Sequence, residues 1–221
     1  MKKIISIILT IAIFFGLIPV NKVNANNVTN LPFKISGGAI IKNRDGSIAK
    51  EIDLEPNFDI DITNSSLYSI NRKAEEIEYV VKAEATFDVS SGNASIQPFG
   101  IVGDVGGSGV TGYLYMKFTW SSVTEMIQVT QIYGSWDVPS VYYLESKVVD
   151  AWTDENHDPF PKYPTSYEFN YTTGWARELW NPPTYISGAK ANSSALVTVP
   201  GMTGGEQELF LFCEVTYDDL E

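Results

Sequence analysis

The sequence predicts an all-β protein, an antiparallel β-sandwich, and three observations support this fold class. From residue 78 onward, apolar residues recur at every second position, which is the period of a strand with one buried face. The alternating stretches are separated by short segments rich in Gly, Pro, Asp and Asn, the residue types that turns require. No stretch of about 30 residues has the strand–helix–strand pattern of a parallel sheet, so antiparallel pairing is expected.

The first 25 residues are predicted to be a cleaved secretory signal peptide of bacterial type. Lys2 and Lys3 precede an almost unbroken apolar run over Ile4–Ile18, and Val23–Ala25 provides the small residues that precede a cleavage site. The apolar run is shorter than the roughly 20 residues that a membrane-spanning helix needs, which disfavours the alternative of a retained anchor. We therefore expect the mature chain to begin at Asn26 and to be secreted into the extracellular space.

Residues 26–77 are expected to be an irregular N-terminal segment that precedes the β-sandwich domain, residues 78–221. This segment is polar, with short apolar pieces at Gly38–Lys42 and Phe58–Thr63, and it is consistent with an arm, an edge strand or a propeptide. Ser69–Glu78 contains good helix formers and is the one helix that we expect in the mature chain.

The first strands of the domain are the most regular. In Tyr79–Val89, the odd-numbered residues form an apolar face and the even-numbered ones a mostly polar face. Val110–Trp120 repeats the pattern, with Tyr113 and Tyr115 on the side opposite the core. Met126–Tyr133 follows after a short polar link, so these two segments are predicted to form a hairpin.

The remaining strands are expected at Val138–Trp152, Ser166–Thr173, Ala195–Val199 and Gln207–Tyr217. The last of these alternates Leu, Leu, Cys and Val on one face with Glu and Phe on the other. About eight strands with polar turns favour a jelly-roll or immunoglobulin-like topology.

Composition restricts the classes of partner. The formal net charge is −12, and removal of a leader that holds three lysines and no acids makes it −15. Such a negative charge disfavours nucleic acid, and the sequence gives no reason to expect stable membrane insertion. With a single cysteine, no internal disulfide can form, so stability must come from buried apolar surface.

The sequence contains no recognisable catalytic residues. The one histidine, His157, lies in a polar loop, and Cys213 lies on an apolar strand face, where a buried, unreactive thiol is expected. A glycoside hydrolase needs only two carboxylates across a cleft, and Glu145, Asp150, Glu168 and Glu178 are candidates.

Asp154, Asn156 and Asp158 place three oxygen donors at alternate positions of one loop, as at the start of a calcium-binding loop. The match to the helical calcium loop fails at Pro159 and Thr165, where glycine and glutamate are required. No cofactor is required by the sequence, and calcium is the ion for which it offers ligands. A solvated acidic turn is the simpler interpretation.

Aromatic residues gather in the predicted loops between 150 and 190. Flat rings beside polar side chains suit a sugar-binding surface and also suit a protein interface, although the same rings could cap the ends of the sandwich. The candidate ligand-binding residues are Trp152, Tyr163, Trp175, Arg177, Trp180 and Tyr185.

These observations favour a secreted binding or surface-interaction module for a glycan or a protein. The first alternative is a secreted glycan hydrolase that uses paired carboxylates. The second is a β-type toxin or bacteriocin-like factor, for which the long alternating hairpin over residues 110–133 is the motivation.

Overall fold

The structure, a computed structural model, is an all-β sandwich of two antiparallel sheets, as predicted. It describes residues 33–54, 57–61, 76–88, 95–98, 109–121, 123–153, 160–179, 188–198 and 206–217. The expected signal peptide and the candidate residues Asp154, Asn156, Asp158, Trp180 and Tyr185 lie outside these ranges. No helix occurs in the described ranges, and so none there is long and apolar enough to cross a membrane.

One sheet has five strands in the order β2-β1-β12-β11-β8. The strands are β1 (Phe33–Asn43), β2 (Ile48–Leu54), β8 (Tyr143–Thr153), β11 (Gly188–Thr198) and β12 (Gln207–Tyr217). β12 lies at the centre, between β1 and β11, although it is the last strand in the chain.

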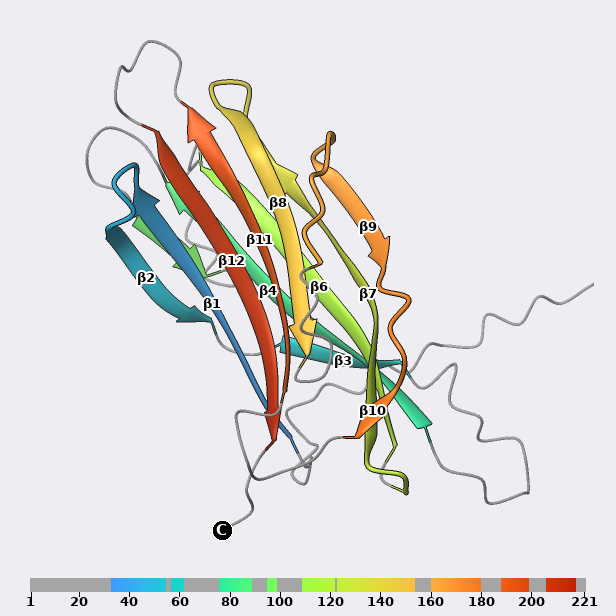
Figure 1. The fold of residues 1–221 in the computed structure, drawn as a ribbon. Coiled ribbons are helices and arrows are strands. Elements are labelled where there is room, and N and C mark those ends of the chain that lie inside the picture. The colour runs from blue at the N-terminus through green and yellow to red at the C-terminus, as the bar shows by residue number, and fades with distance from the viewer. Residues whose placement is uncertain are drawn as a thin grey trace, which may run out of the picture.

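The other sheet has seven strands, with the path β10-β7-β6-β4-β3 and two additional pairings, β5 with β4 and β9 with β7. The strands are β3 (Asn57–Asp61), β4 (Glu76–Asp88), β5 (Ser95–Pro98), β6 (Val110–Ser121), β7 (Met126–Asp137), β9 (Glu168–Thr172) and β10 (Glu178–Leu179). The predicted hairpin is confirmed, since β6 and β7 pair along their length. Figure 1 shows the two sheets as layers whose strands run in roughly the same direction.

The N-terminal region departs from expectation. Residues 33–54 were expected to be irregular, but they form β1 and β2, and β1 pairs with β12 from Phe33↔Tyr217 to Asn43↔Gln207. The expected helix at Ser69–Glu78 is also wrong where it can be checked, because Glu76 already belongs to β4. The described ranges contain twelve strands rather than about eight, because short strands such as β5 and β10 give almost no periodic signal.

The core lies between the inner faces of the two sheets. Leu209, Leu211 and Cys213 of β12 are fully buried, as are Leu114 and Met116 of β6. This is the division of faces that the alternating pattern predicted for the last strand and for Val110–Trp120.

A hydrogen bond crosses the core between the sheets. Trp136 Nε1 on β7 donates to Ser193 Oγ on β11 at 3.1 Å, and both side chains are buried. The bond satisfies two polar groups that would otherwise be unpaired in an apolar interior, so it also fixes how the sheets face each other.

Residues 160–173 close one side of the sandwich. The backbones of Val149 on β8 and Lys162 exchange two hydrogen bonds of 2.8 and 2.9 Å, and Trp136 N on β7 donates to Tyr167 O at 3.0 Å. The segment therefore connects an edge of the five-stranded sheet to the seven-stranded sheet before it enters β9.

Candidate functional site

The candidate site lies on the outer face of the seven-stranded sheet, where the strand register aligns side chains in rows across β4, β6, β7 and β9. One row, here called the tyrosine row, consists of Lys82, Tyr115, Tyr133 and Asn170. The next, the serine row, consists of Glu84, Tyr113, Ser135 and Glu168. Side chains that lie directly opposite each other on neighbouring strands are close enough to interact, so the members of each row are described together.

Tyr115 and Tyr133 form a parallel stack at the centre of the tyrosine row. Their ring centroids are 4.7 Å apart and their planes differ by 4°. This separation equals the spacing of adjacent strands, so the rings stack along the direction that joins the strands. Lys82 Nζ lies 5.7 Å from the centroid of Tyr115 on the β4 side. The second face of Tyr133 therefore points toward β9.

An open hollow of about 540 Å³ adjoins this stack. It is lined by Tyr115, Tyr133, Gly134, Ser135, Ser166, Glu168, Phe169 and Asn170. The tyrosine pair forms one wall, the two small residues of β7 form the floor, and the residues at and before the start of β9 form the other wall.

Two local features keep the hollow open beside Tyr133. Gln131 Nε2 donates to Asn170 Oδ1 at 2.6 Å, which draws the Asn170 amide toward Gln131 and away from the serine row. In the serine row itself, Ser135 is a small side chain between the larger Tyr113 and Glu168. Both features leave open space beside the ring of Tyr133, above these shorter side chains.

Gly134 is required at the floor of the hollow. A Cβ at this position would overlap the carbonyl oxygen of Tyr113 on β6 and would lie 2.8 Å from Cζ of Phe169 on β9. The backbone of β7 thus runs unusually close to its neighbour here, which only a residue without a side chain permits.

A β-bulge in β7 precedes the site. The register between β6 and β7 shifts after Lys117, which leaves Thr130 as the extra residue. Thr130 Oγ1 donates to Lys117 O at 3.2 Å, and Thr173 N donates to Thr130 O at 3.1 Å. The bulge keeps Val129 and Ile132 both inward, so Tyr133 and Ser135 face outward beside Tyr115 and Tyr113.

The charges at the β4 end of the rows are paired. Lys82 and Glu84 form an ion pair. Burial lowers the pKa of Lys82, but the hydrogen bond and charge of Glu84 and the contact with Tyr115 outweigh it, so the net pKa is raised. The pKa of Tyr113 is raised by burial, and then by the charges of Glu84 and Asp137. Lys82 is therefore held as a cation on the side of the stack away from the hollow.

Comparison with known proteins gave no match to a family model, to a curated protein or to a solved structure.

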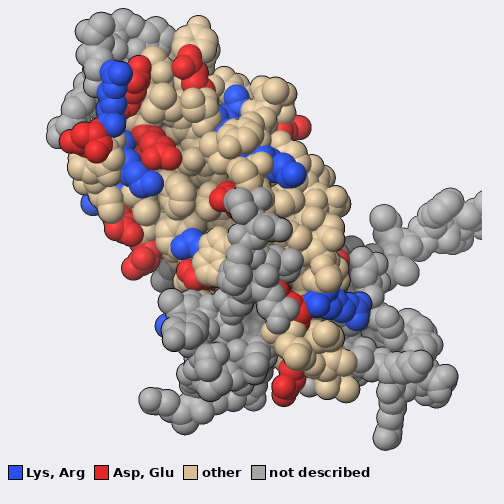
Figure 2. All heavy atoms as spheres, in the orientation of Figure 1, with Lys and Arg blue, Asp and Glu red and all other residues tan. Residues whose placement is uncertain are grey.

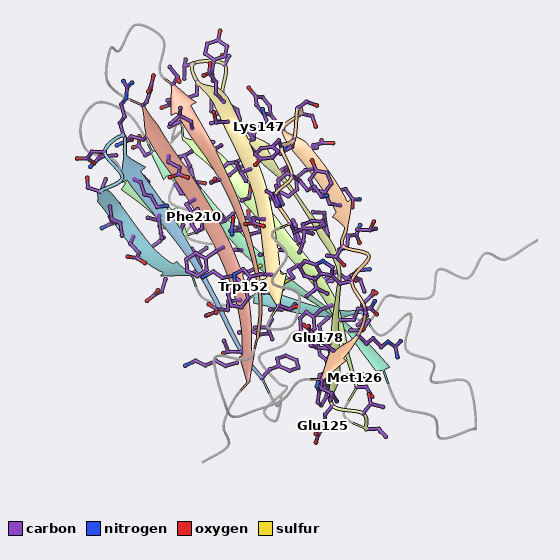
Figure 3. All side chains as sticks on the ribbon, in the orientation of Figure 1. Glu125, Met126, Lys147, Trp152, Glu178 and Phe210 are labelled. Carbon is purple, nitrogen blue, oxygen red and sulfur yellow. The ribbon has the colours of Figure 1, made fainter. Side chains whose placement is uncertain are left out.

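The structure separates the described members of the predicted aromatic site. Trp152 lies on β8, half-buried on the outer face of the five-stranded sheet, opposite Lys190 of β11. Of the residues labelled in Figure 3, Phe210 belongs to the same sheet as Trp152, whereas Glu178 and Met126 belong to the other sheet, at the paired ends of β10 and β7. Tyr163 is 71% exposed in the closing segment.

Trp175 packs partly against the core instead of extending from a loop. Its ring meets Phe160 edge to face at a centroid distance of 5.6 Å, and its carbonyl oxygen accepts a 2.6 Å hydrogen bond from Gln128 Nε2. Arg177, two residues on, is exposed. For Trp175, the structure therefore favours a ring that caps the sandwich over a ring that binds a ligand.

The predicted carboxylates lie on different strands. Glu145 and Asp150 belong to β8, Glu168 to β9 and Glu178 to β10. Asp150 Oδ1 accepts hydrogen bonds from the backbone of Ala151 and Phe160 at 2.9 and 3.1 Å, so it anchors the closing segment. Glu178 is buried, and Glu168 alone among the four lines the hollow.

The calcium hypothesis concerns residues outside the described ranges, where His157 also lies, and it stays a hypothesis. Within the described ranges no group of three or more His, Cys, Asp or Glu side chains could hold a metal ion. Cys213 is fully buried, and burial raises the pKa of its thiol to about 12, as expected for an unreactive cysteine.

The outer face of the five-stranded sheet carries paired charges beside its aromatic rings. Figure 2 shows the outer side of the five-stranded sheet, where acidic and basic residues are interspersed. Lys42 pairs with Glu208 at 3.5 Å and lies over the ring of Phe210, and Lys190 pairs with Glu214 at 3.8 Å and lies over the ring of Phe212. These lysines lie over the half-buried rings of Phe210 and Phe212, whereas Tyr143 on β8 of the same sheet is 56% exposed, so the tyrosine stack is distinguished by the hollow beside it.

Sequence reasoning placed Tyr113 and Tyr115 on the outer face but did not recognise a site there. The pattern gave no reason to single these tyrosines out, because tyrosine is common in strands whatever its role. The alignment of Tyr133, Ser135 and Glu168 with them depends on the bulge and on the register of β9, which the sequence pattern does not reveal.

Proposed function

We propose that this protein is a non-catalytic glycan-binding module, expected to act outside the cell, and that the hollow beside Tyr133 holds a sugar ring. The observation that carries the proposal is the ring face of Tyr133, directed toward an open polar hollow by its stack with Tyr115. Aromatic faces pack against the apolar faces of pyranoses, and neighbouring polar groups bind the hydroxyls.

The polar groups around the hollow support this assignment. With Oδ1 of Asn170 bonded to Gln131, its Nδ2 group can donate to a ligand. Ser166 Oγ donates to the Glu168 carbonyl at 2.5 Å and can accept from a ligand, and the Glu168 carboxylate accepts. Donors and acceptors at one rim of an aromatic surface match the mixed hydrogen bonding of sugar hydroxyls.

The spacing of Glu84 and Glu168 does not suit glycoside hydrolysis by that pair. Glu84 and Glu168 are in one row but are separated by three strand intervals of about 4.8 Å, or about 14 Å in total. Glycosidases use carboxyl groups about 5 to 9.5 Å apart, and Glu84 is already paired with Lys82. Hydrolysis by Glu84 and Glu168 is therefore disfavoured, whereas Asp137 lies diagonal to Glu168 at about 7 to 8 Å, so release of reducing ends is the observation that separates binding from cleavage.

The test is a glycan array followed by calorimetric titration of the best ligand. Tyr133→Ala should weaken binding about tenfold or more, because it removes the platform, and about 1.4 kcal/mol corresponds to a factor of ten. Tyr143→Ala is the matched control, since Tyr143 is 56% exposed on β8 of the other sheet. Circular dichroism should show that both variants are folded.

Two results would contradict the proposal. One is an array on which the folded protein retains no glycan. The other is a ligand whose affinity is the same for Tyr133→Ala and for the unaltered protein, which would place binding elsewhere. Release of reducing ends during the titration would instead support the hydrolase alternative.

A further inference from the structure

We infer that the hollow prefers amino sugars with a free ammonium group over neutral and acidic sugars, with Glu168 as the residue that determines this specificity. The inference rests on the proposed glycan-binding function and adds the chemical class of the ligand. It is based on the charges around the hollow rather than on the tyrosine platform.

Among the described residues that line the hollow, Glu168 is the one charged side chain. It is exposed on β9 and lies in the serine row, and none of these described residues is a lysine or an arginine. A carboxylate that faces a ligand at close range attracts a cation and repels an anion.

The charged residues near the hollow also favour a cationic ligand. Asp137 follows Ser135 on the same face of β7. The pKa of Tyr113 is raised mainly by burial, then by the charge of Glu84, and then by the charge of Asp137. Lys82 lies on the other side of the tyrosine stack, paired with Glu84. Lys147 lies over the ring of Tyr167, 5.3 Å from its centroid, and does not line the hollow.

The geometry suits an ammonium substituent on a stacked sugar. A pyranose on the Tyr133 face would place its substituents over Ser135 and toward β9, where Glu168 can accept a charge-assisted hydrogen bond. The tyrosine ring adds a cation–π attraction for the same group. A uronate carboxylate in this position would face Glu168 as a like charge.

The experiment compares three oligosaccharides of equal length by calorimetry in weakly acidic buffer of low salt. They are a β-1,4-linked glucosamine oligomer, its fully N-acetylated counterpart and a galacturonic acid oligomer. The glucosamine oligomer should bind about five- to tenfold more tightly than the acetylated one, and the uronate should bind most weakly. Physiological salt should reduce the preference, because it screens exposed charges.

Glu168→Gln provides the decisive variant. It should abolish the preference by weakening the binding of the glucosamine oligomer more than that of the acetylated one. Glu145→Gln, an exposed carboxylate on β8 of the other sheet, should preserve the preference. Equal binding of the two oligomers, or a preference that Glu168→Gln leaves unchanged, would overturn the inference.

The two proposals fail in different ways. If the acetylated oligomer binds through Tyr133 and the glucosamine oligomer shows no advantage, the charge preference is wrong and glycan binding stands. If none of the three oligomers binds and the glycan array is also empty, both proposals are wrong.

Discussion

At the scale of single residues, Cys213 and Tyr79 illustrate what burial does to an ionisable group. Both side chains face the core, Cys213 from β12 and Tyr79 from β4. Burial raises the pKa of each to about 12, from ordinary values of 9.0 for the thiol and 10.0 for the phenol. Neither group therefore carries charge in the folded protein at neutral pH.

This burial predicts a loss of stability in alkaline solution. Above about pH 9 the unfolded chain releases the thiol proton while the folded protein retains it, so the free energy of unfolding falls as pH rises. Above about pH 9, Cys213 should lower the free energy of unfolding by about 1.4 kcal/mol for each pH unit. Above about pH 10, Tyr79 should lower it by a similar amount for each unit.

Urea unfolding curves between about pH 7 and 11 would measure this loss. Cys213→Ala should be less stable at neutral pH, because it leaves a cavity, but its stability should decline less steeply above about pH 9. Tyr79→Phe should remove the part that begins near pH 10. Parallel declines in all three proteins would show that other groups cause the alkaline loss.

At the scale of elements, glycines explain why one strand was not predicted. β1 contains Gly37 and Gly38, which weaken a strand signal and made this region resemble a loop. In the structure, a Cβ on Gly38 would meet the ring of Phe212 at 2.5 Å. The glycine leaves room for a side chain of the neighbouring strand, a reason that is visible only after β1 and β12 are paired.

Gly134 in β7 also leaves space for a neighbouring strand, and this role can be tested by substitution. Gly134→Ala should destabilise the protein by about 1 to 3 kcal/mol and should weaken glycan binding, because its Cβ would overlap the Tyr113 carbonyl and push β7 from β6. Gly37→Ala is the matched control, since the nearest atom to its Cβ would be Phe212 O at 3.3 Å. Thermal unfolding and titration would compare them, and equal effects would refute the special role of Gly134.

At the scale of the whole molecule, the sandwich depends on strands from both ends of the described chain. β1 supplies Phe33, Ile35 and Ile41 to the core and covers an edge of β12. Each of these side chains contributes about 1.5 to 3 kcal/mol on burial, so together they approach the whole stability of a domain, about 5 to 15 kcal/mol. A propeptide that included β1 is therefore disfavoured.

A deletion tests this dependence. A chain that begins at Asn26 should fold, whereas one that lacks residues 26–54 should lose cooperative unfolding and aggregate, because the edge of β12 and the core become exposed. Near-ultraviolet circular dichroism and size-exclusion chromatography would show the difference. Retention of a cooperative transition without residues 26–54 would indicate that this segment is dispensable.

The sequence by itself determined the fold class and the inward faces of the long strands. Alternation assigned Leu209, Leu211 and Cys213 to the core without any knowledge of their partners, because the pleat of a single strand fixes which residues share a face. It also placed Tyr113 and Tyr115 on the outer side of their strand.

Only the tertiary structure decided which strands are neighbours and which side chains meet. The partner of Tyr115 is Tyr133 because of a bulge at Thr130, and the hollow exists because β9 pairs with β7 in one particular register. Register depends on contacts between residues far apart in the chain, and those contacts leave no periodic trace in either segment. The candidate site is therefore a property of the assembled sheet, whereas the core faces are properties of its individual strands.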